Sequence, residues 1–158
     1  MTKASPSYVA PPWDAVPTAR PRLGELLIRR GFIDEKQLAW ALGEAQAKNE
    51  LLGVVLLRER IIFEDELART LSQQLSIPYL NIRHIGVDAA VARLLPAEVG
   101  EAAIAIPVRA TDGVVQVAFA DPTDPSALTA VTGRLPKTSI AVAEMSEIKR
   151  AWQSLAGR

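Results

Sequence analysis

The chain has 158 residues, 49% of them hydrophobic and 23% charged, which is enough to bury a core as one domain or as two small ones. Lys plus Arg and Asp plus Glu number 18 each, so the net charge of +0 provides no general attraction to DNA, RNA or an anionic membrane. Because Cys is absent, disulfides and thiolate nucleophiles are excluded, and the cytoplasm is the expected compartment.

Residues 1–21 contain five prolines among small residues. Each proline removes a backbone donor and disfavours helix at the residue before it, so we predict a flexible arm. Its aromatic residues Tyr8 and Trp13 are expected to be exposed to solvent, with docking onto a surface or partner as the alternative. The N-terminus lacks a secretory signal, and no apolar run reaches the roughly 20 residues of a spanning helix, so no direct membrane insertion is expected.

Residues 22–76 contain one pattern twice, with a single offset of 29 residues. Each copy begins with a Leu-Gly pair and continues through leucines at helical spacing. A helical hairpin of about 25 residues cannot bury its own apolar stripe, so the two copies are expected to pack together as a four-helix unit. The repeated pairs are Leu23 and Leu52, Gly24 and Gly53, Leu27 and Leu56, Leu38 and Leu67, and Leu42 and Leu71.

The periodicity of each copy predicts a short helix followed by a longer one. In the first copy, Gly31 is well placed to end the short helix and Asp34 to cap the longer one. Trp40, on the longer helix, is expected in the core rather than at an interface. Gly24 and Gly53 each cost roughly 1 kcal/mol relative to Ala inside a helix, which indicates close approach by a ligand or by another helix.

Residues 77–158 predict a small sheet with helices. Helix candidates cover residues 87–94 and 97–102, and strands cover 104–108 and 114–120 around a turn at 111–113. Asp124 is expected to cap a helix that runs to about Thr132, residues 140–143 form a third strand, and Ser146 opens the last helix. The predicted fold class is α+β: an N-terminal four-helix unit of two helical hairpins (residues 22–76), followed by a small two-layer α/β sandwich (residues 77–158).

Catalytic motifs are absent from the sequence: we find no P-loop, no H-E-x-x-H, no G-x-S-x-G and no G-x-G-x-x-G. The single histidine, His84, lies in a strand-like segment, residues 79–85, where a lone His is usually structural or exposed. The segment from Asp121 to Asp124 is typical of a turn and helix cap rather than a metal site, because no His or carboxylate cluster accompanies it. We therefore predict no enzyme activity, no metal and no cofactor.

Several motifs together resemble a known family. The copies follow Arg-Leu-Gly-x-x-Leu-x-x-x-Gly and then Leu-x-x-x-Leu-x-x-Gln, and the family's later phrases occur in order at residues 77–82, 94–96, 106–108 and 115–124. This combination resembles the cyclic di-GMP-binding N-terminal domain of type II secretion and type IV pilus assembly ATPases over about residues 22–156. The resemblance implies a non-catalytic regulatory or docking domain of such an ATPase system, which a partner could recruit to the inner membrane.

The resemblance also implies a cyclic di-GMP site. Guanine N7 and O6 accept hydrogen bonds that Arg donates in pairs, and backbone N–H groups suit the phosphates. The start of the first copy would contact one half of the nucleotide, the start of the second copy the other half, and Asp121 would meet the N1–H and N2–H edge of a guanine. The implied set is Arg22, Leu23, Gly24, Leu38, Leu42, Gln46, Leu52, Gly53, Leu67, Leu71, Gln74 and Asp121.

Both copies depart from the family pattern. In the second copy, Leu51 stands where Arg is expected and Arg60 where the second Gly is expected. In the first copy, Ala45 stands where Gln is expected, with Gln46 one residue later. If each lost contact is worth about 1 to 3 kcal/mol, two losses lower the affinity by two or more orders of magnitude. The first copy therefore carries the better half-site.

Two functions of other kinds stay open on the sequence. The domain could be an interaction module, without nucleotide, that docks a cytoplasmic ATPase to an inner-membrane platform protein of type II secretion; the leucine stripes and the lost nucleotide contacts both favour this. Alternatively, it could regulate another output, such as an attached glycosyltransferase. The sequence is compatible with an excised N-terminal domain and with a stand-alone adaptor.

Overall fold

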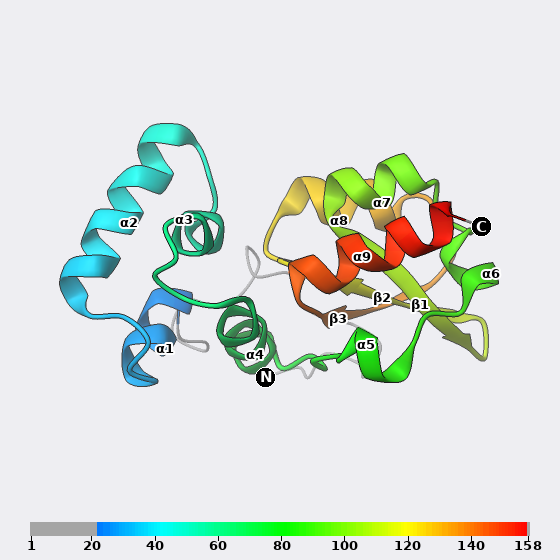
Figure 1. Cartoon of the computed structure of the whole chain (residues 1–158), viewed down its shortest axis with the longest axis horizontal. Coiled ribbons are helices and arrows are strands. Elements are labelled where there is room, and N and C mark those ends of the chain that lie inside the picture. Colours follow the sequence, from blue (N-terminus) through cyan, green and yellow to red (C-terminus); the bar gives the residue numbers. More distant parts are fainter. Residues whose placement is uncertain (1–21, 158) are drawn as a thin grey trace, which may run out of the picture.

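The computed structural model describes residues 22–157, and the predicted arm lies outside them. Helices fill one end of the molecule and a small sheet with its own helices fills the other (Figure 1). The predicted α+β architecture is confirmed. The helices at the first end are α1 (Leu23–Arg29), α2 (Glu35–Lys48), α3 (Leu52–Arg58) and α4 (Glu64–Leu75).

The sequence repeat is a structural repeat with the same offset. Helices α1 and α3 have seven residues each, and α2 and α4 begin at equivalent positions, Glu35 and Glu64. The residue before each long helix is held in the same way: the backbone N–H of Asp34 donates to Gln37 Oε1, and that of Phe63 donates to Glu66 Oε1, both at 2.9 Å. In the first copy the contact is reciprocal, because Asp34 Oδ1 also accepts a hydrogen bond from the backbone N–H of Gln37 at 2.8 Å, which completes a capping box. Phe63 has no side-chain acceptor, so the second copy keeps only the Glu66 half of the box.

The two hairpins bury their leucines against each other. Helix α1 packs against α4, and α2 packs against α3, so each copy completes the core of the other. Leu27 and Leu56, which are equivalent in the repeat, are both fully buried, as is Leu71. The cross-packing explains why the leucines are repeated, since neither hairpin closes a core alone.

The second half of the chain forms a three-stranded sheet in the order β1-β2-β3. Strand β1 (Ala105–Thr111) pairs antiparallel with β2 (Val114–Phe119), and β2 pairs parallel with β3 (Thr138–Val142) after a helical crossover. The helices of this half are α5 (Ile82–Ile85), α6 (Ala89–Ala92), α7 (Ala97–Ala103), α8 (Pro125–Thr132) and α9 (Met145–Ala156).

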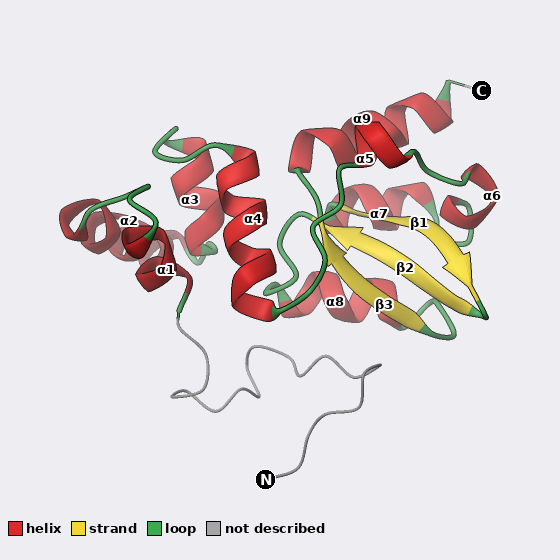
Figure 2. Cartoon of the chain, turned by 90° about the horizontal axis from the view of Figure 1, so that it is seen from below, coloured by secondary structure: helices red, strands yellow, loops and turns green. Residues whose placement is uncertain are grey.

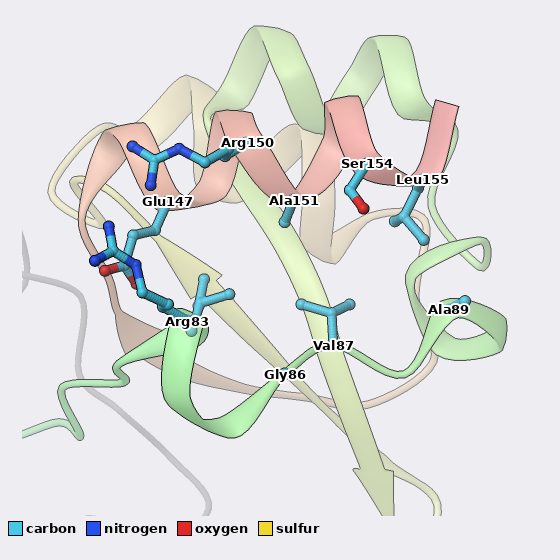
Figure 3. Close-up of a pocket in the computed structure, with 10 residues that line it drawn as sticks. Arg83, Gly86, Val87, Ala89, Glu147, Arg150, Ala151, Ser154 and Leu155 are labelled. Carbon is cyan, nitrogen blue, oxygen red and sulfur yellow. The ribbon is translucent and has the colours of Figure 1, made fainter. Parts of the chain in front are cut away.

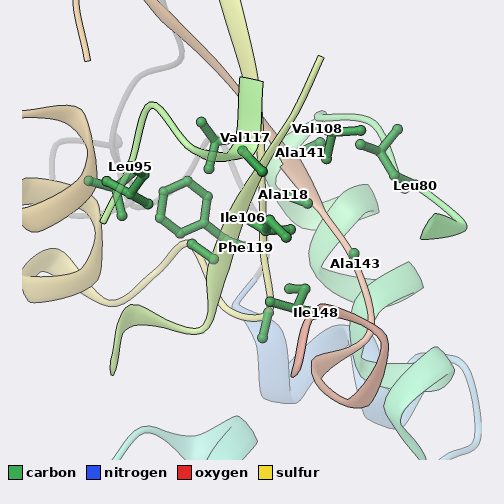
Figure 4. Packing of buried hydrophobic residues seen from close by; sticks show 14 of the residues in the cluster. Leu80, Leu95, Ile106, Val108, Val117, Ala118, Phe119, Ala141, Ala143 and Ile148 are labelled. Atoms are coloured by element: carbon green, nitrogen blue, oxygen red, sulfur yellow. The ribbon is translucent and has the colours of Figure 1, made fainter. Parts of the chain in front are cut away.

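Helices α7, α8 and α9 cover one face of this sheet, as Figures 1 and 2 show from two directions. The core between the layers contains Ile106, Val117, Phe119 and Ile148, each with no exposed surface (Figure 4). Strand β3 joins the two halves, because α4 packs against it and its last residue, Val142, belongs to the core of the helical half.

Several sequence expectations for this half need correction. Residues 79–85 are not a strand: Asn81 Oδ1 accepts a hydrogen bond from the backbone N–H of His84 at 3.2 Å and begins α5, leaving only a bridge between Tyr79 and Val142. The helix predicted over residues 87–94 is a single turn, α6, whose start is capped by Asp88 through a hydrogen bond from the backbone N–H of Ala90 to Asp88 Oδ1 at 3.0 Å. Ile104 ends α7 in the left-handed region, with φ 51°, instead of starting β1.

In the helical half, Trp40 is not a core residue. Its side chain is 46% exposed, and that of Leu42 is 49% exposed. The buried positions of α2 are Ala41 and Ala45, whose small side chains let α3 approach closely. Trp40 and Leu42 therefore face outward, against the expectation that they fill the core, whereas Leu38 is half-buried and packs against it.

Tyr79 ties the two halves together. Its hydroxyl donates to Glu144 Oε2 at 2.8 Å, and the guanidinium carbon of Arg69, on α4, lies 4.8 Å from its ring centroid. Burial, followed by the hydrogen bond to Glu144, raises the pKa of Tyr79 to about 12. The protonated phenol is thus favoured in the folded state.

We expect Tyr79→Phe to lower the free energy of unfolding by about 1 kcal/mol near neutral pH, because it removes one hydrogen bond to a carboxylate at a half-exposed site. A raised folded-state pKa means that the phenol's contribution is complete below the unfolded pKa of about 10 and is lost as the pH rises through about 12. Urea unfolding at several alkaline pH values checks this, with Glu144→Gln as the partner in a double-mutant cycle. Parallel pH profiles for wild type and Tyr79→Phe would contradict it.

Candidate functional site

The repeated glycines lie where the next helix comes close. A Cβ added to Gly24 would lie 2.6 Å from Leu38 Cδ1, and one added to Gly53 would lie 3.2 Å from Leu67 Cδ1. These four residues are pairwise equivalent in the repeat. Close approach by a following helix is one of the two explanations that the sequence left open, and it accounts for both glycines without a ligand.

Arg22 and Leu51 occupy equivalent backbone positions. Each precedes the first residue of a short helix, with φ −73° in both and ψ 155° and 149° respectively. Arg22 is exposed, and its backbone N–H donates to Glu25 Oε1 at 3.0 Å. Leu51 is half-buried, and Val54 stands where Glu25 does. The second copy therefore keeps the backbone of the first but not its guanidinium.

Arg60 departs from the family pattern at a position where the backbone requires a left-handed residue. Gly31 has φ 78°, and its equivalent Arg60 has φ 58°. For residues other than Gly, this conformation costs roughly 1 to 2 kcal/mol because Cβ approaches a carbonyl oxygen. The second copy therefore has the same turn as the first, with a strained backbone at Arg60.

We expect Arg60→Gly to raise the free energy of unfolding by about 1 kcal/mol, since relief of the strain outweighs the extra chain entropy of Gly. The reverse change at the equivalent site, Gly31→Arg, should lower it by roughly 1 to 2 kcal/mol, although nothing lies within 4 Å of a Cβ placed there. Urea midpoints of the two variants test this pair. A less stable Arg60→Gly protein would show that the Arg60 side chain makes a stabilising contact.

The other predicted site residues differ in how far their side chains are exposed to solvent. Leu42 and Gln46 are exposed on α2, while Leu23, Leu38, Leu52 and Gln74 are half-buried. Leu67 is 4% exposed and Leu71 is fully buried, so both belong to the core and Leu71 offers no surface to a ligand in this conformation. In the first copy, the residues available to a ligand are Arg22, Leu23, Leu38, Leu42 and Gln46.

Asp121 lies at the junction between the two halves. Its Oδ2 is 3.3 Å from a Cβ placed on Gly53, and its Oδ1 accepts hydrogen bonds from the Thr123 backbone N–H at 2.9 Å and from Thr123 Oγ1 at 2.5 Å. Burial raises the pKa of Asp121 above its ordinary value, against the opposing effect of the Thr123 hydrogen bonds. The structure thus brings Gly53, Leu67 and Asp121 together across the junction.

The sequence did not indicate the crevice beside this junction. A cavity of about 410 Å³ separates the start of α3 from the start of α8 and is lined by Asn49, Glu50, Leu51, Val54, Asp124 and Ser126. Leu51 lies on its wall, so a side chain at this position faces both halves of the protein. No short motif marks such a crevice, because its walls come from loops about 75 residues apart.

Two further observations limit the chemistry. Within residues 22–157, no group of three or more His, Asp or Glu side chains is placed to hold a metal ion. No helix of the described part is long and apolar enough to span a bilayer.

Comparison with known proteins gives consistent matches. The MshEN domain family matches residues 75–158, which include the sheet but almost none of the repeat. The type IV pilus assembly ATPase PilB of Myxococcus xanthus is 34% identical over 103 residues, which is 65% of this chain and 18% of PilB. PilB of Thermus thermophilus is 31% identical over 105 residues, 65% of this chain and 12% of that protein. The chain thus spans less than a fifth of these relatives.

Solved structures match over most of the chain, including the repeat. A structure of MshE with cyclic di-GMP aligns with a TM-score of 0.74 and 28% identity, over 86% of this chain and 99% of that one. The N-terminal domain of XpsE aligns with a TM-score of 0.71 and 27% identity, over 84% of this chain and 92% of that one.

Proposed function

The chain belongs to the MshEN domain family, as its motifs predicted, and we propose that it is a non-catalytic domain that binds cyclic di-GMP and regulates a pilus assembly or secretion ATPase in the cytoplasm. The observation that carries this proposal is the close packing of Gly24 on the half-buried Leu38, two residues after the exposed Arg22, with Leu42 and Gln46 also exposed on α2. The alignment with MshE, whose structure contains cyclic di-GMP, supports it.

The proposed chemistry is uneven between the copies. In the first, Arg22 donates to N7 and O6 of one guanine while leucine surfaces cover the base. In the second, Leu52 and Gly53 contact the other half of the nucleotide and Asp121 accepts from the guanine N1–H and N2–H edge. Asp121 is half-buried beside Gly53, so this contact requires the nucleotide to enter between the two halves.

Calorimetric titration of the full chain with cyclic di-GMP tests the proposal. We expect Arg22→Ala to weaken binding about 5- to 150-fold, because a bidentate Arg contact with guanine is worth about 1 to 3 kcal/mol. Arg29→Ala is the matched control, since Arg29 is an exposed arginine at the other end of α1. No heat from wild type at tens of micromolar nucleotide would refute the binding proposal, and equal loss in both variants would place the site elsewhere.

A docking role is the second candidate function, and the exposure of Trp40 favours it. An indole that is 46% exposed on a helix at the end of the molecule is a typical anchor at protein interfaces. The proposed partner is the cytoplasmic part of an inner-membrane platform protein, which would recruit the domain to the membrane.

The docking role predicts that Trp40→Ala abolishes capture of the purified cytoplasmic part of such a platform protein. Phe63→Ala is the matched control, because Phe63 is 70% exposed at the start of α4 and lies outside this surface. Capture that is unchanged in Trp40→Ala would refute this surface, whatever the result of the nucleotide titration.

A further inference from the structure

A groove of about 300 Å³ lies far from the repeat, between α9 and the segment from α5 to α6 (Figure 3). Its apolar walls are Ile82, Val87, Ala151 and Leu155. All of its lining residues come from the second half of the chain, so it shares no residue with the proposed nucleotide site. Nothing in the proposed function uses it.

The two ends of the groove differ in charge. Arg83 and Arg150 lie at the end where α9 begins, while Ser154 and Leu155 lie at the other end (Figure 3). Both arginines are exposed, and among residues 22–157 neither guanidinium has an ion pair or a hydrogen bond with another side chain. The groove therefore offers two available guanidinium groups next to an apolar surface.

The carboxylate of Glu147 offsets only part of the positive charge at this end of the groove. It is only 8% exposed, and its Oε1 accepts a hydrogen bond from the backbone N–H of Arg83 at 3.2 Å. The acid thus positions α5 against α9 from within. One buried carboxylate faces two exposed guanidinium groups, which leaves positive charge at the mouth of the groove.

We propose that this groove binds an acidic, extended segment of a partner protein, with a carboxylate between Arg83 and Arg150 and an apolar side chain between Val87 and Leu155. Charge complementarity selects the acid, because Arg forms paired hydrogen bonds with carboxylates. The apolar wall favours a ligand with an apolar side chain, which a free phosphate ion does not have. A protein segment supplies both features in one ligand.

The dimensions of the groove also specify the spacing in the segment. Along α9, Arg150 and Leu155 are separated by about 7.5 Å at a rise of 1.5 Å per residue. An extended chain advances about 3.3 Å per residue and places every second side chain on one face. The acidic and apolar side chains of the ligand should therefore lie two residues apart.

The test is a titration of the full chain with a synthetic peptide, Glu-Ser-Leu-Ser-Glu-Ser-Leu. Binding is monitored by NMR through the chemical shifts of the backbone amides and the Arg Nε groups. We expect shifts at Arg83, Arg150 and Ala151. We expect about tenfold weaker binding of two control peptides, one with Lys in place of Glu and one with Ser in place of Leu. Equal binding of either control peptide, shifts confined to α2, or no shifts at millimolar peptide would overturn the proposal.

Two charge variants distinguish specific binding in the groove from nonspecific electrostatic attraction. The double variant Arg83→Glu with Arg150→Glu should no longer bind the acidic peptide and should bind the Lys peptide instead. The control double variant, Lys137→Glu with Lys149→Glu, makes the same charge change at exposed positions outside the groove and should still bind the acidic peptide. Ala151→Leu fills the groove without altering charge and should also weaken binding about tenfold. Equal loss in the two charge variants would show nonspecific attraction and refute the site.

Discussion

Gly100→Ala is expected to lower the free energy of unfolding by about 3 kcal/mol, the largest stability change predicted for a single methyl group in this protein. A Cβ at this position of α7 would lie 2.3 Å from Trp152 Cζ2, 2.7 Å from Trp152 Cε2 and 2.9 Å from the Ala105 carbonyl oxygen. The indole cannot move aside easily, because it is 3% exposed and its Nε1–H donates to that same carbonyl at 2.8 Å. Overpacking and loss of this hydrogen bond outweigh the roughly 1 kcal/mol by which Ala favours helix.

Urea or thermal unfolding measures this loss, which corresponds to roughly 6 to 12 °C for a protein of this size. Gly43→Ala is the matched control: Gly43 also lies within a helix, nothing lies within 4 Å of its added Cβ, and the change should stabilise the protein by about 0.5 to 1 kcal/mol. Trp152→Phe should partly rescue Gly100→Ala in a double-mutant cycle, because Phe lacks the edge that clashes. A Gly100→Ala protein as stable as wild type would contradict the packing argument.

The elements that the sequence predicted well are those with local signals. The repeat, the caps at Asp34 and Asp124 and the turn after Gly31 rest on residues within a few positions of each other, and each appears in the structure. Residues 79–85 show why local reading failed: Leu80 and Ile82 are both buried, which fits a strand, yet Asn81 caps a helical turn there. Burial patterns over so few residues do not distinguish the two.

The candidate site was less predictable because it depends on packing between distant segments. The sequence analysis placed Trp40 in the core because Trp is more often a core than an interface residue, but the buried residues of α2 are Ala41 and Ala45. Leu71 repeats Leu42 in the sequence, but Leu71 is fully buried and Leu42 is half exposed, since α4 packs against β3 as well as α1, whereas α2 packs against α3. Equivalent residues of the two copies therefore differ in their exposure to solvent.

Leu51→Arg is expected to strengthen cyclic di-GMP binding about 5- to 100-fold, which makes it the most informative change for function. Leu51 has nearly the backbone angles of Arg22 and faces the crevice between the two halves, so an Arg there leaves the helix start in the same direction. A restored bidentate contact is worth about 1 to 3 kcal/mol, less a fraction for the apolar contact that half-buried Leu51 gives up. Adding Arg60→Gly should stabilise this variant without much further gain in affinity.

Calorimetry with Phe63→Arg as control distinguishes a restored half-site from added positive charge, since Phe63 is 70% exposed at the start of α4 and lies outside the predicted set. If Leu51→Arg and Phe63→Arg increase the affinity for cyclic di-GMP equally, the nucleotide is attracted by charge alone and position 51 is not the site of a lost contact. If only Leu51→Arg gains, and Arg22→Ala in that background loses about as much as it does in wild type, then the two copies contact the two halves of one nucleotide independently. Because the backbone of the repeat is preserved at both positions, a gain at Leu51 would show that the fold kept a binding geometry after the sequence had lost one of its donors.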